Sequence, residues 1–217
     1  VAAKLATYET PFYLYDVELL HQTLESLMSM ASKYDYKIHY AIKANYDPRL
    51  LQIIRQHGLG IDCASGNEVR CAIEASFDPK TIVYAGVGKR DKEIRYAIEQ
   101  GIFAINCESI EELHVVNEIA GEMGKVMSVG LRVNPDIDPK TNHCIDTGQA
   151  DSKFGISYEE ILASVEDIKS LKNLDVIGMH IHIGSQIREL HVFENMCNKV
   201  NAIVQNLTDL GFELEFV

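Results

Sequence analysis

The sequence lacks the patterns that mark zinc sites, disulfide frameworks and membrane segments. Its five cysteines are scattered and none forms a C-x-x-C pair, which argues against both a structural zinc and a disulfide framework. No apolar run approaches membrane-spanning length, and no positively charged leader precedes an apolar stretch. The net charge of −12 disfavours nucleic acids and anionic membranes as partners. We therefore expect a protein of a reduced, cytoplasmic compartment. We expect it to bind neither nucleic acids nor membranes.

The 217 residues alternate between short apolar or β-branched runs and segments of helical periodicity. The apolar runs are 37–43, 59–64, 81–87, 102–107, 126–133, 176–183 and 213–217. The helical segments are 47–54, 67–75, 91–100, 111–120, 158–171 and 190–210. Such alternation predicts a parallel α/β sheet with right-handed crossovers. The seven runs are one short of a (β/α)8 barrel, so we expect an incomplete TIM-like barrel.

Lys43 lies in the apolar run His39-Tyr40-Ala41-Ile42-Lys43-Ala44-Asn45. If this run is a strand, Lys43 shares a face with Ala41 and His39, and small neighbours leave room beside its amine. Burying an unpaired ammonium is costly. One interpretation is a Schiff-base partner for a carbonyl compound or for pyridoxal 5′-phosphate (PLP). The other is a strand-end lysine that extends to water, and this segment alone leaves both open.

Other reactive side chains also stand at or just past the ends of predicted strands. They are Asp62, Arg132, His182 and Ser185, and barrel enzymes assemble their active sites at these ends. Two of them have a structural alternative: Asp62 as a cap of the next helix, and Arg132 as a buried ion-pair partner. The Gly184-Ser185 pair is also suited to receive a phosphate on backbone amides.

Two further motifs give weaker signals. The run Gly86-Val87-Gly88-Lys89-Arg90-Asp91 begins like a dinucleotide-binding fingerprint but lacks the third glycine. His180 and His182 are spaced to share a strand face and are a candidate metal pair. Because no obvious further ligands follow the remaining strands, we expect no metal site.

Four segments taken together resemble the fold-type III PLP-dependent decarboxylases. They are Thr10-Pro11-Phe12-Tyr13-Leu14-Tyr15-Asp16, Tyr40-Ala41-Ile42-Lys43-Ala44-Asn45, Ile61-Asp62-Cys63-Ala64-Ser65-Gly66-Asn67-Glu68 and His180-Ile181-His182-Ile183-Gly184-Ser185-Gln186. The resemblance covers essentially the whole chain.

A fifth path is similar to the branch of this family that acts on meso-diaminopimelate. It runs through Arg132-Val133-Asn134-Pro135-Asp136-Ile137-Asp138 and Thr147-Gly148 to Ser152-Lys153-Phe154-Gly155-Ile156. Ornithine decarboxylases look similar at the lysine and the histidine but lack this path. Residues 141–146 differ from the usual sequence pattern of the family, so the resemblance implies no detailed roles for that loop.

The resemblance implies a barrel of the alanine racemase and ornithine decarboxylase type. Residues 1–20 would be the entry segment of a C-terminal β domain, and residues 21–217 the PLP-binding barrel, truncated in about its seventh strand. The glycine-rich phosphate loop, the catalytic cysteine and the β domain itself would follow Val217. We therefore expect the chain to be the N-terminal half of an enzyme.

The resemblance also implies the roles of the site residues. Lys43 would hold PLP as a Schiff base, and His182 would stack on the pyridine ring. Asp62 would lie near the Lys43 amine and help to set its protonation. Arg132 would lie near the ring and its phenolic oxygen, and Ser185 would hydrogen-bond the phosphate.

The implied reaction is decarboxylation of meso-diaminopimelate to L-lysine and carbon dioxide, the last step of lysine biosynthesis. It would be carried out by a homodimer with shared active sites, and Lys153 would lie near the dimer contact. Two alternatives stay open: a related decarboxylase for ornithine, arginine or carboxynorspermidine, and a single-barrel PLP carrier without catalysis.

Overall fold

Parallel strands form the centre of the molecule in the computed structural model, which describes residues 5–135 and 154–217. Their bounds are β1 (His39–Ala41), β2 (Gly60–Cys63), β3 (Ile82–Tyr84), β4 (Ala104–Cys107), β5 (Met127–Asn134), β6 (Ile156–Ser157) and β7 (Leu174–His180). The sheet runs from β1 to β5 in chain order, and β5 then pairs with β7 along most of its length and with β6 at its carboxyl end. The predicted parallel α/β architecture is therefore confirmed.

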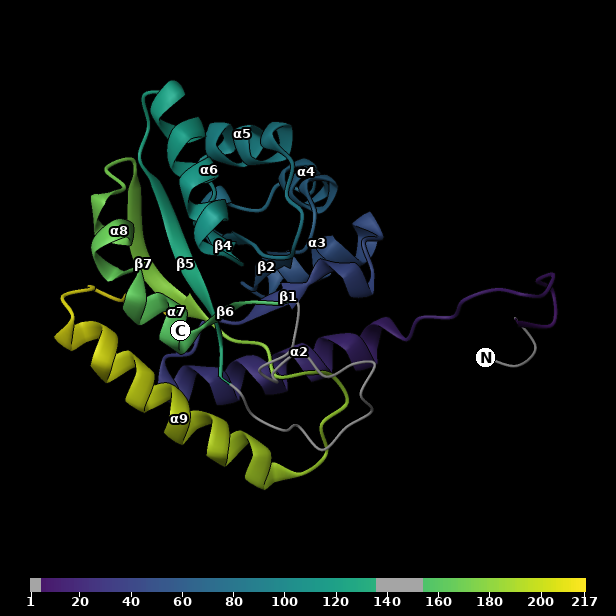
Figure 1. Cartoon of the computed structure of the whole chain (residues 1–217). Coiled ribbons are helices and arrows are strands. Elements are labelled where there is room, and N and C mark those ends of the chain that lie inside the picture. Colours follow the sequence, from purple (N-terminus) through teal and green to yellow (C-terminus); the bar gives the residue numbers. More distant parts are fainter. Residues whose placement is uncertain (1–4, 136–153) are drawn as a thin grey trace.

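Helices follow most of the strands and cover the sheet (Figure 1). Their bounds are α2 (Val17–Ala31), α3 (Pro48–Gln56), α4 (Gly66–Glu74), α5 (Asp91–Gln100), α6 (Ile110–Glu122), α7 (Tyr158–Ala163), α8 (Val165–Ser170) and α9 (Leu190–Asp209), with 3-10 turns at Ser32–Tyr34, Ile42–Ala44 and Pro79–Thr81. Helices α4, α5 and α6 lie side by side on the sheet. No helix of the described residues is long and apolar enough to span a membrane.

Local sequence explains where several helices begin and end. The Asp47 side chain accepts a hydrogen bond from the backbone N–H of Arg49 at the start of α3, where Pro48 occupies the first turn. Ser65 and Ser109 cap α4 and α6 in the same way. Gly101 ends α5 with a φ of 66°, a left-handed conformation that glycine adopts without steric cost.

The two faces of the sheet carry different residues. Ile61, Cys63 and Ile82 are completely buried within the core that the helices cover, and burying each such isoleucine contributes roughly 1.5–3 kcal/mol. The alternate positions follow a different pattern, because the register aligns Arg132 of β5 with His180 of β7. Polar side chains of different strands therefore meet on the inner face.

The predicted seventh strand, residues 213–217, appears as a single parallel bridge between Phe216 and Gly178 rather than as a full strand. The Phe216 ring lies so close to Gly130 and Gly178 that a Cβ at either glycine would overlap it. Glycine is therefore required at these two positions by the close approach of the ring. The ring fills the inner face of the sheet beside β5 and β7.

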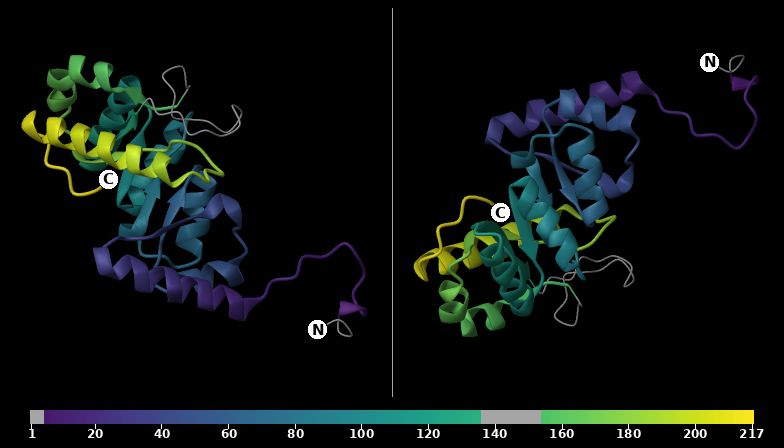
Figure 2. Two further views of the ribbon diagram at one scale, coloured as in Figure 1. Left: turned by 90° about the horizontal axis from the view of Figure 1, so that it is seen from below. Right: turned by 90° about the horizontal axis from the view of Figure 1, so that it is seen from above.

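The sequence-based expectations miss three local features. Helix α2 was not predicted, although Asp16 caps it through the Leu19 N–H. The helix predicted over 158–171 is interrupted at Ser164. Residues 11–16 form neither helix nor strand and extend away from the body of the molecule (Figure 2). The division into 1–20 and 21–217 stays a prediction, and α2 begins within the first of these segments.

Candidate functional site

Lys43 follows β1 rather than lying within it. The strand ends at Ala41, and Ile42–Ala44 form a 3-10 turn, so the predicted alternation that placed Lys43 on the face of Ala41 is wrong. The turn buries Ile42 completely in the core and leaves Lys43 exposed. The ammonium therefore incurs no burial cost and is accessible to a ligand at the carboxyl end of the sheet.

The backbone beyond Lys43 is fixed by two tyrosine contacts. The Tyr40 hydroxyl donates to the carbonyl oxygen of Asn45 at 3.1 Å. The Asn45 side-chain amide donates to the Tyr15 hydroxyl at 2.8 Å. Both bonds hold the chain at Asn45, two residues after Lys43.

Asp62 lies on β2 beside the end of β1, where it faces Ala41. Burial raises the pKa of Asp62, and the nearby charges of Lys43 and His39 oppose that shift. Because Ser65 caps α4, the alternative that Asp62 caps this helix is wrong. The Asp62 carboxyl group instead lies close enough to Lys43 for their charges to interact.

Arg132 forms a buried ion pair with Glu108. Its Nη1 donates to Glu108 Oε1 at 2.6 Å, and the two side chains are 8% and 6% exposed. The guanidinium also lies 4.8 Å from the centroid of the Phe154 ring, a cation–π distance. The expected ion pair is therefore present, and the charge of Arg132 also reaches Asp62 and His182.

His180 ends β7 opposite Arg132 of β5. Burial lowers the pKa of His180 to about 3, and the charges of Arg132 and His182 act in the same direction. Burial also lowers the pKa of His182, with contributions from Arg132 and Lys43. Both imidazoles are therefore neutral near pH 7. The residues described by the structure hold no group of three or more side chains suited to a metal ion.

The buried His180 predicts a pH-dependent stability. Unfolded His180 takes up a proton near pH 6.5, whereas the folded pKa is about 3. The unfolded state therefore binds more protons between these values, so the free energy of unfolding falls as the pH is lowered. Melting temperatures measured between pH 7.5 and 4.5 should fall less steeply for His180→Asn than for the wild type. The exposed His191 provides the control, His191→Asn, and equal slopes for all three proteins would contradict this assignment.

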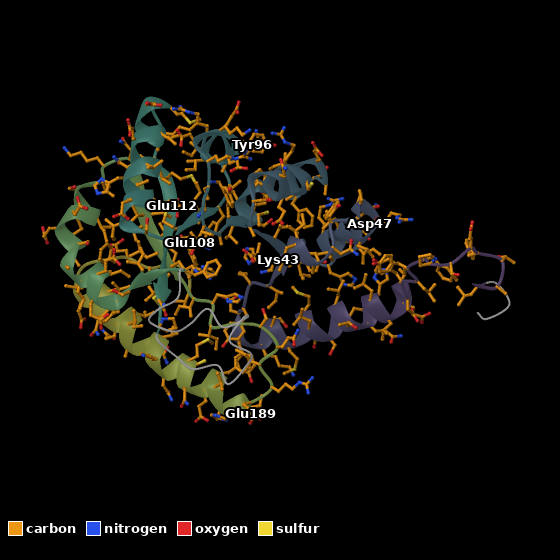
Figure 3. The ribbon with its side chains drawn as sticks, turned by 45° about the vertical axis from the view of Figure 1, so that its right-hand side comes forward. Lys43, Asp47, Tyr96, Glu108, Glu112 and Glu189 are labelled. Atoms are coloured by element: carbon orange, nitrogen blue, oxygen red, sulfur yellow. The ribbon has the colours of Figure 1, made fainter. Side chains whose placement is uncertain are left out.

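Glu108, Lys89 and Glu112 were not predicted as site residues. Glu108 follows β4 directly, and Lys89 lies in the loop between β3 and α5 with its side chain 1% exposed. The Lys89 amine donates to Glu112 Oε1 at 2.9 Å, so the glycine-rich loop holds a buried cation. The sequence signal was Ser109-x-x-Glu112, a helix-start pattern immediately after a strand-end acid. In the view of Figure 3, Glu108 lies between Glu112, which belongs to α6, and Lys43, which follows β1.

The remaining predicted residues are less constrained. Ser185 is exposed in the loop between β7 and α9. Lys153, the Thr147-Gly148 pair and the stretch 141–146 lie outside the described residues. The structure thus brings Lys43, Asp62, Arg132 and His182 to one end of the sheet, and it leaves the roles of all five predicted residues as proposals.

The chain is similar to known proteins over nearly all of its length. Residues 17–217 match the family described as pyridoxal-dependent decarboxylase, pyridoxal binding domain. The diaminopimelate decarboxylase of Bacteroides thetaiotaomicron is 45% identical over 205 residues, which are 94% of this chain and 53% of that protein.

Two solved structures share the fold. Diaminopimelate decarboxylase from Helicobacter pylori, complexed with L-lysine, superposes with a TM-score of 0.90 at 33% identity, covering 99% of this chain and 55% of that one. The enzyme from M. jannaschii, also with L-lysine, has a TM-score of 0.86 at 31% identity, covering 98% and 51%. The chain thus spans about half the length of the relatives that it matches. It belongs to the pyridoxal-dependent decarboxylases, as a homologue of the pyridoxal-binding domain of diaminopimelate decarboxylase.

Proposed function

We propose that this chain is the PLP-binding part of a decarboxylase that converts meso-diaminopimelate to L-lysine and carbon dioxide. The observation that carries the proposal is the exposed Lys43 amine at the carboxyl end of the sheet, beside Asp62, in a chain whose residues 17–217 match a pyridoxal binding domain. An accessible amine at this end of a barrel is suited to hold an aldehyde.

The side chains at this end of the sheet fit PLP in their chemistry. Lys43 offers an amine for the aldehyde carbon, and Arg132 offers a permanent cation for an anionic ligand. His182 offers a neutral, flat imidazole. In the described residues His180 Nδ1 and Asn106 Oδ1 are buried without a hydrogen-bond partner. These two atoms of the inner face are therefore available for hydrogen bonds to a ligand.

Each residue has a distinct task in this proposal. PLP supplies, when bound, the electron sink that decarboxylation requires. Lys43 holds the cofactor through its ε-amine. Asp62 exchanges a proton with that amine, a task favoured by the burial that raises the pKa of its carboxyl group. His182 packs on the ring, and Arg132 stays charged beside it.

The phosphate contact and the assembly are also proposals. Ser185 is exposed after β7, where its hydroxyl is available to a phosphate oxygen. The homodimer and the cytoplasmic location rest on the sequence resemblance alone. The substrate assignment is supported by the relatives with 31–45% identity, two of which hold L-lysine.

The substrate assignment is tested by carbon dioxide release from the full-length gene product loaded with PLP. The proposal predicts release from meso-diaminopimelate and far less from ornithine, arginine or carboxynorspermidine. Release from one of these three instead would show that this compound, and not meso-diaminopimelate, is the substrate. PLP binding without release from any of them would favour the carrier alternative.

Replacing His182 by alanine should weaken cofactor retention without unfolding the sheet. The imidazole is half-buried, and loss of one ring contact costs roughly 0.5–1.5 kcal/mol, about twofold to twelvefold in the dissociation constant of PLP. Fluorescence titration of the apoprotein measures this constant, with His191→Asn as the control. A dissociation constant and a turnover rate equal to those of the wild type would refute the stacking role.

A further inference from the structure

The Glu108 carboxylate joins three separate segments of the chain. Its Oε1 accepts hydrogen bonds from Arg132 Nη1 at 2.6 Å and from the Gly86 N–H at 2.8 Å. Its Oε2 accepts from the Gly155 N–H at 3.2 Å. These donors lie on β5, in the loop between β3 and α5, and just before β6. One side chain thus fixes the relative places of all three.

A second carboxylate holds Glu108 itself. The Glu108 backbone N–H donates to Glu112 Oε2 at 2.6 Å, and Glu112 Oε1 accepts from Lys89 Nζ at 2.9 Å. Lys89 also donates to the carbonyl oxygens of Gly86 and Asn106, each at 2.8 Å. The network therefore contains two carboxylates and two cations, which balance in charge away from water.

Stability alone is a poor explanation for this network. Burying an ion pair costs several kcal/mol per ion in desolvation, and a well-packed apolar pair at such a place is often equally stable. The pair also stands at the end of the sheet that carries Lys43 and Asp62. Arg132 is held on one side by Glu108 and packs against the Phe154 ring, so its guanidinium has little freedom to rotate.

We propose that Glu108 is a positioning residue that fixes the Arg132 guanidinium where it meets the anionic cofactor. The inference rests on the proposed function and deepens it, because it assigns to a residue outside the ligand contacts the task of placing the cation. Without Glu108, Arg132 would turn towards other partners and the Phe154–Gly155 segment would lose its anchor. A fixed cation saves the entropy of ordering it when the ligand binds.

The test uses Glu108→Gln in the full-length gene product. This variant keeps the side-chain shape but removes the charge that pairs with Arg132. Hydrogen bonds to charged groups contribute about 1.5–3 kcal/mol, so we expect the dissociation constant of PLP to rise by about tenfold or more. Fluorescence titration of the apoprotein gives this constant independently of turnover. Glu118→Gln, at an exposed acid of α6, the helix that begins after Glu108, should bind PLP as the wild type does.

A double-mutant cycle with Arg132→Gln separates positioning from a general structural effect. If Glu108 acts through Arg132, the double variant should bind PLP no more weakly than Arg132→Gln alone. Effects that multiply in the double variant would overturn the proposal. A Glu108→Gln protein that binds PLP within a factor of about two of the wild type, less than the loss of one such bond, would also overturn it.

Circular dichroism and a melting curve accompany each titration. If Glu108→Gln does not fold, Glu108→Asp replaces it. The aspartate keeps the charge but is one methylene shorter, so it cannot hold both Arg132 and Gly155. Weaker PLP binding by this folded variant supports the proposal, and unchanged binding overturns it. A wild-type protein that binds no PLP would instead overturn the proposed function, whatever the variants do.

Discussion

Lys43→Ala should abolish covalent attachment of PLP while the protein stays folded. Lys43 is exposed and follows β1 in a short turn that Ile42 anchors in the core. Substitutions at such exposed positions change the free energy of unfolding by about 0.5 kcal/mol or less. The amine, in contrast, is the only group that we assign to bind the aldehyde carbon, so its loss should remove the attachment completely. Intact-mass analysis after incubation with PLP and borohydride measures the bound pyridoxyl group.

The matched control for this experiment is Lys80→Ala, which removes an exposed lysine from the turn before β3. It should take up as much label at the Lys43 position as the wild type does. Full decarboxylase activity in Lys43→Ala would refute the assignment of this residue. A cooperative melting curve close to that of the wild type is needed to show that the loss is chemical.

Lys89→Met should cause the largest loss of stability among single substitutions at this end of the sheet. The Lys89 side chain is 1% exposed and its amine donates three hydrogen bonds. Methionine fills similar volume but leaves the Glu112 carboxylate and two carbonyl oxygens without the amine. Removing one partner of a buried ion pair costs about 3–5 kcal/mol in the free energy of unfolding. Denaturant titration of the full-length gene product measures the change.

The control is Lys92→Met, three residues further along the chain and exposed, which should change the free energy of unfolding by about 0.5 kcal/mol or less. A loss at position 89 no larger than that at position 92 would show that the buried amine contributes little. That result would also argue against a role of Lys89 and Glu112 in holding Glu108.

The order of the strands and helices was predictable because each element is encoded locally. Apolar runs bounded by helical segments place Lys43, Asp62, Arg132 and His182 after or near strand ends, and a parallel sheet brings such ends to one edge. One helix start was equally local, since Asp47-Pro48 opens α3 as expected. For α4 the cap considered was Asp62, whereas Ser65 caps the helix. Architecture and candidate residues therefore followed from short stretches of sequence.

The surroundings of these residues were not predictable in the same way. Alternation along a strand cannot reveal that the chain leaves β1 at Ala41 and turns, and this turn is what exposes Lys43. Glu108 looks like an ordinary acid before a helix, yet its partners lie 22, 24 and 47 residues away in sequence. Hydrogen bonds over such separations depend on the register of the whole sheet, which no local pattern specifies.

Helix α2 and the break at Ser164 show the same limit at smaller scale. The cap at Asp16 and the buried Leu24 mark an amphipathic helix, whereas the resemblance of residues 10–16 to an entry strand predicts an extended segment. At Ser164, where φ is −108° and ψ is 7°, the chain leaves the helical conformation and separates α7 from α8, although the apolar period continues through Ile161 and Ile168. Periodicity detects the buried face and not the interruption.

The most direct test of the account locates the cofactor on the chain. The full-length gene product is incubated with PLP, reduced with borohydride and digested, and the pyridoxyl-bearing peptide is identified by mass spectrometry. The same preparation, before reduction, is assayed for carbon dioxide release from meso-diaminopimelate. We expect a label on Lys43 together with release of carbon dioxide. A label on a different lysine, or no label at all, would contradict it and would mean that Lys43 is a solvent-exposed lysine without a role in cofactor binding.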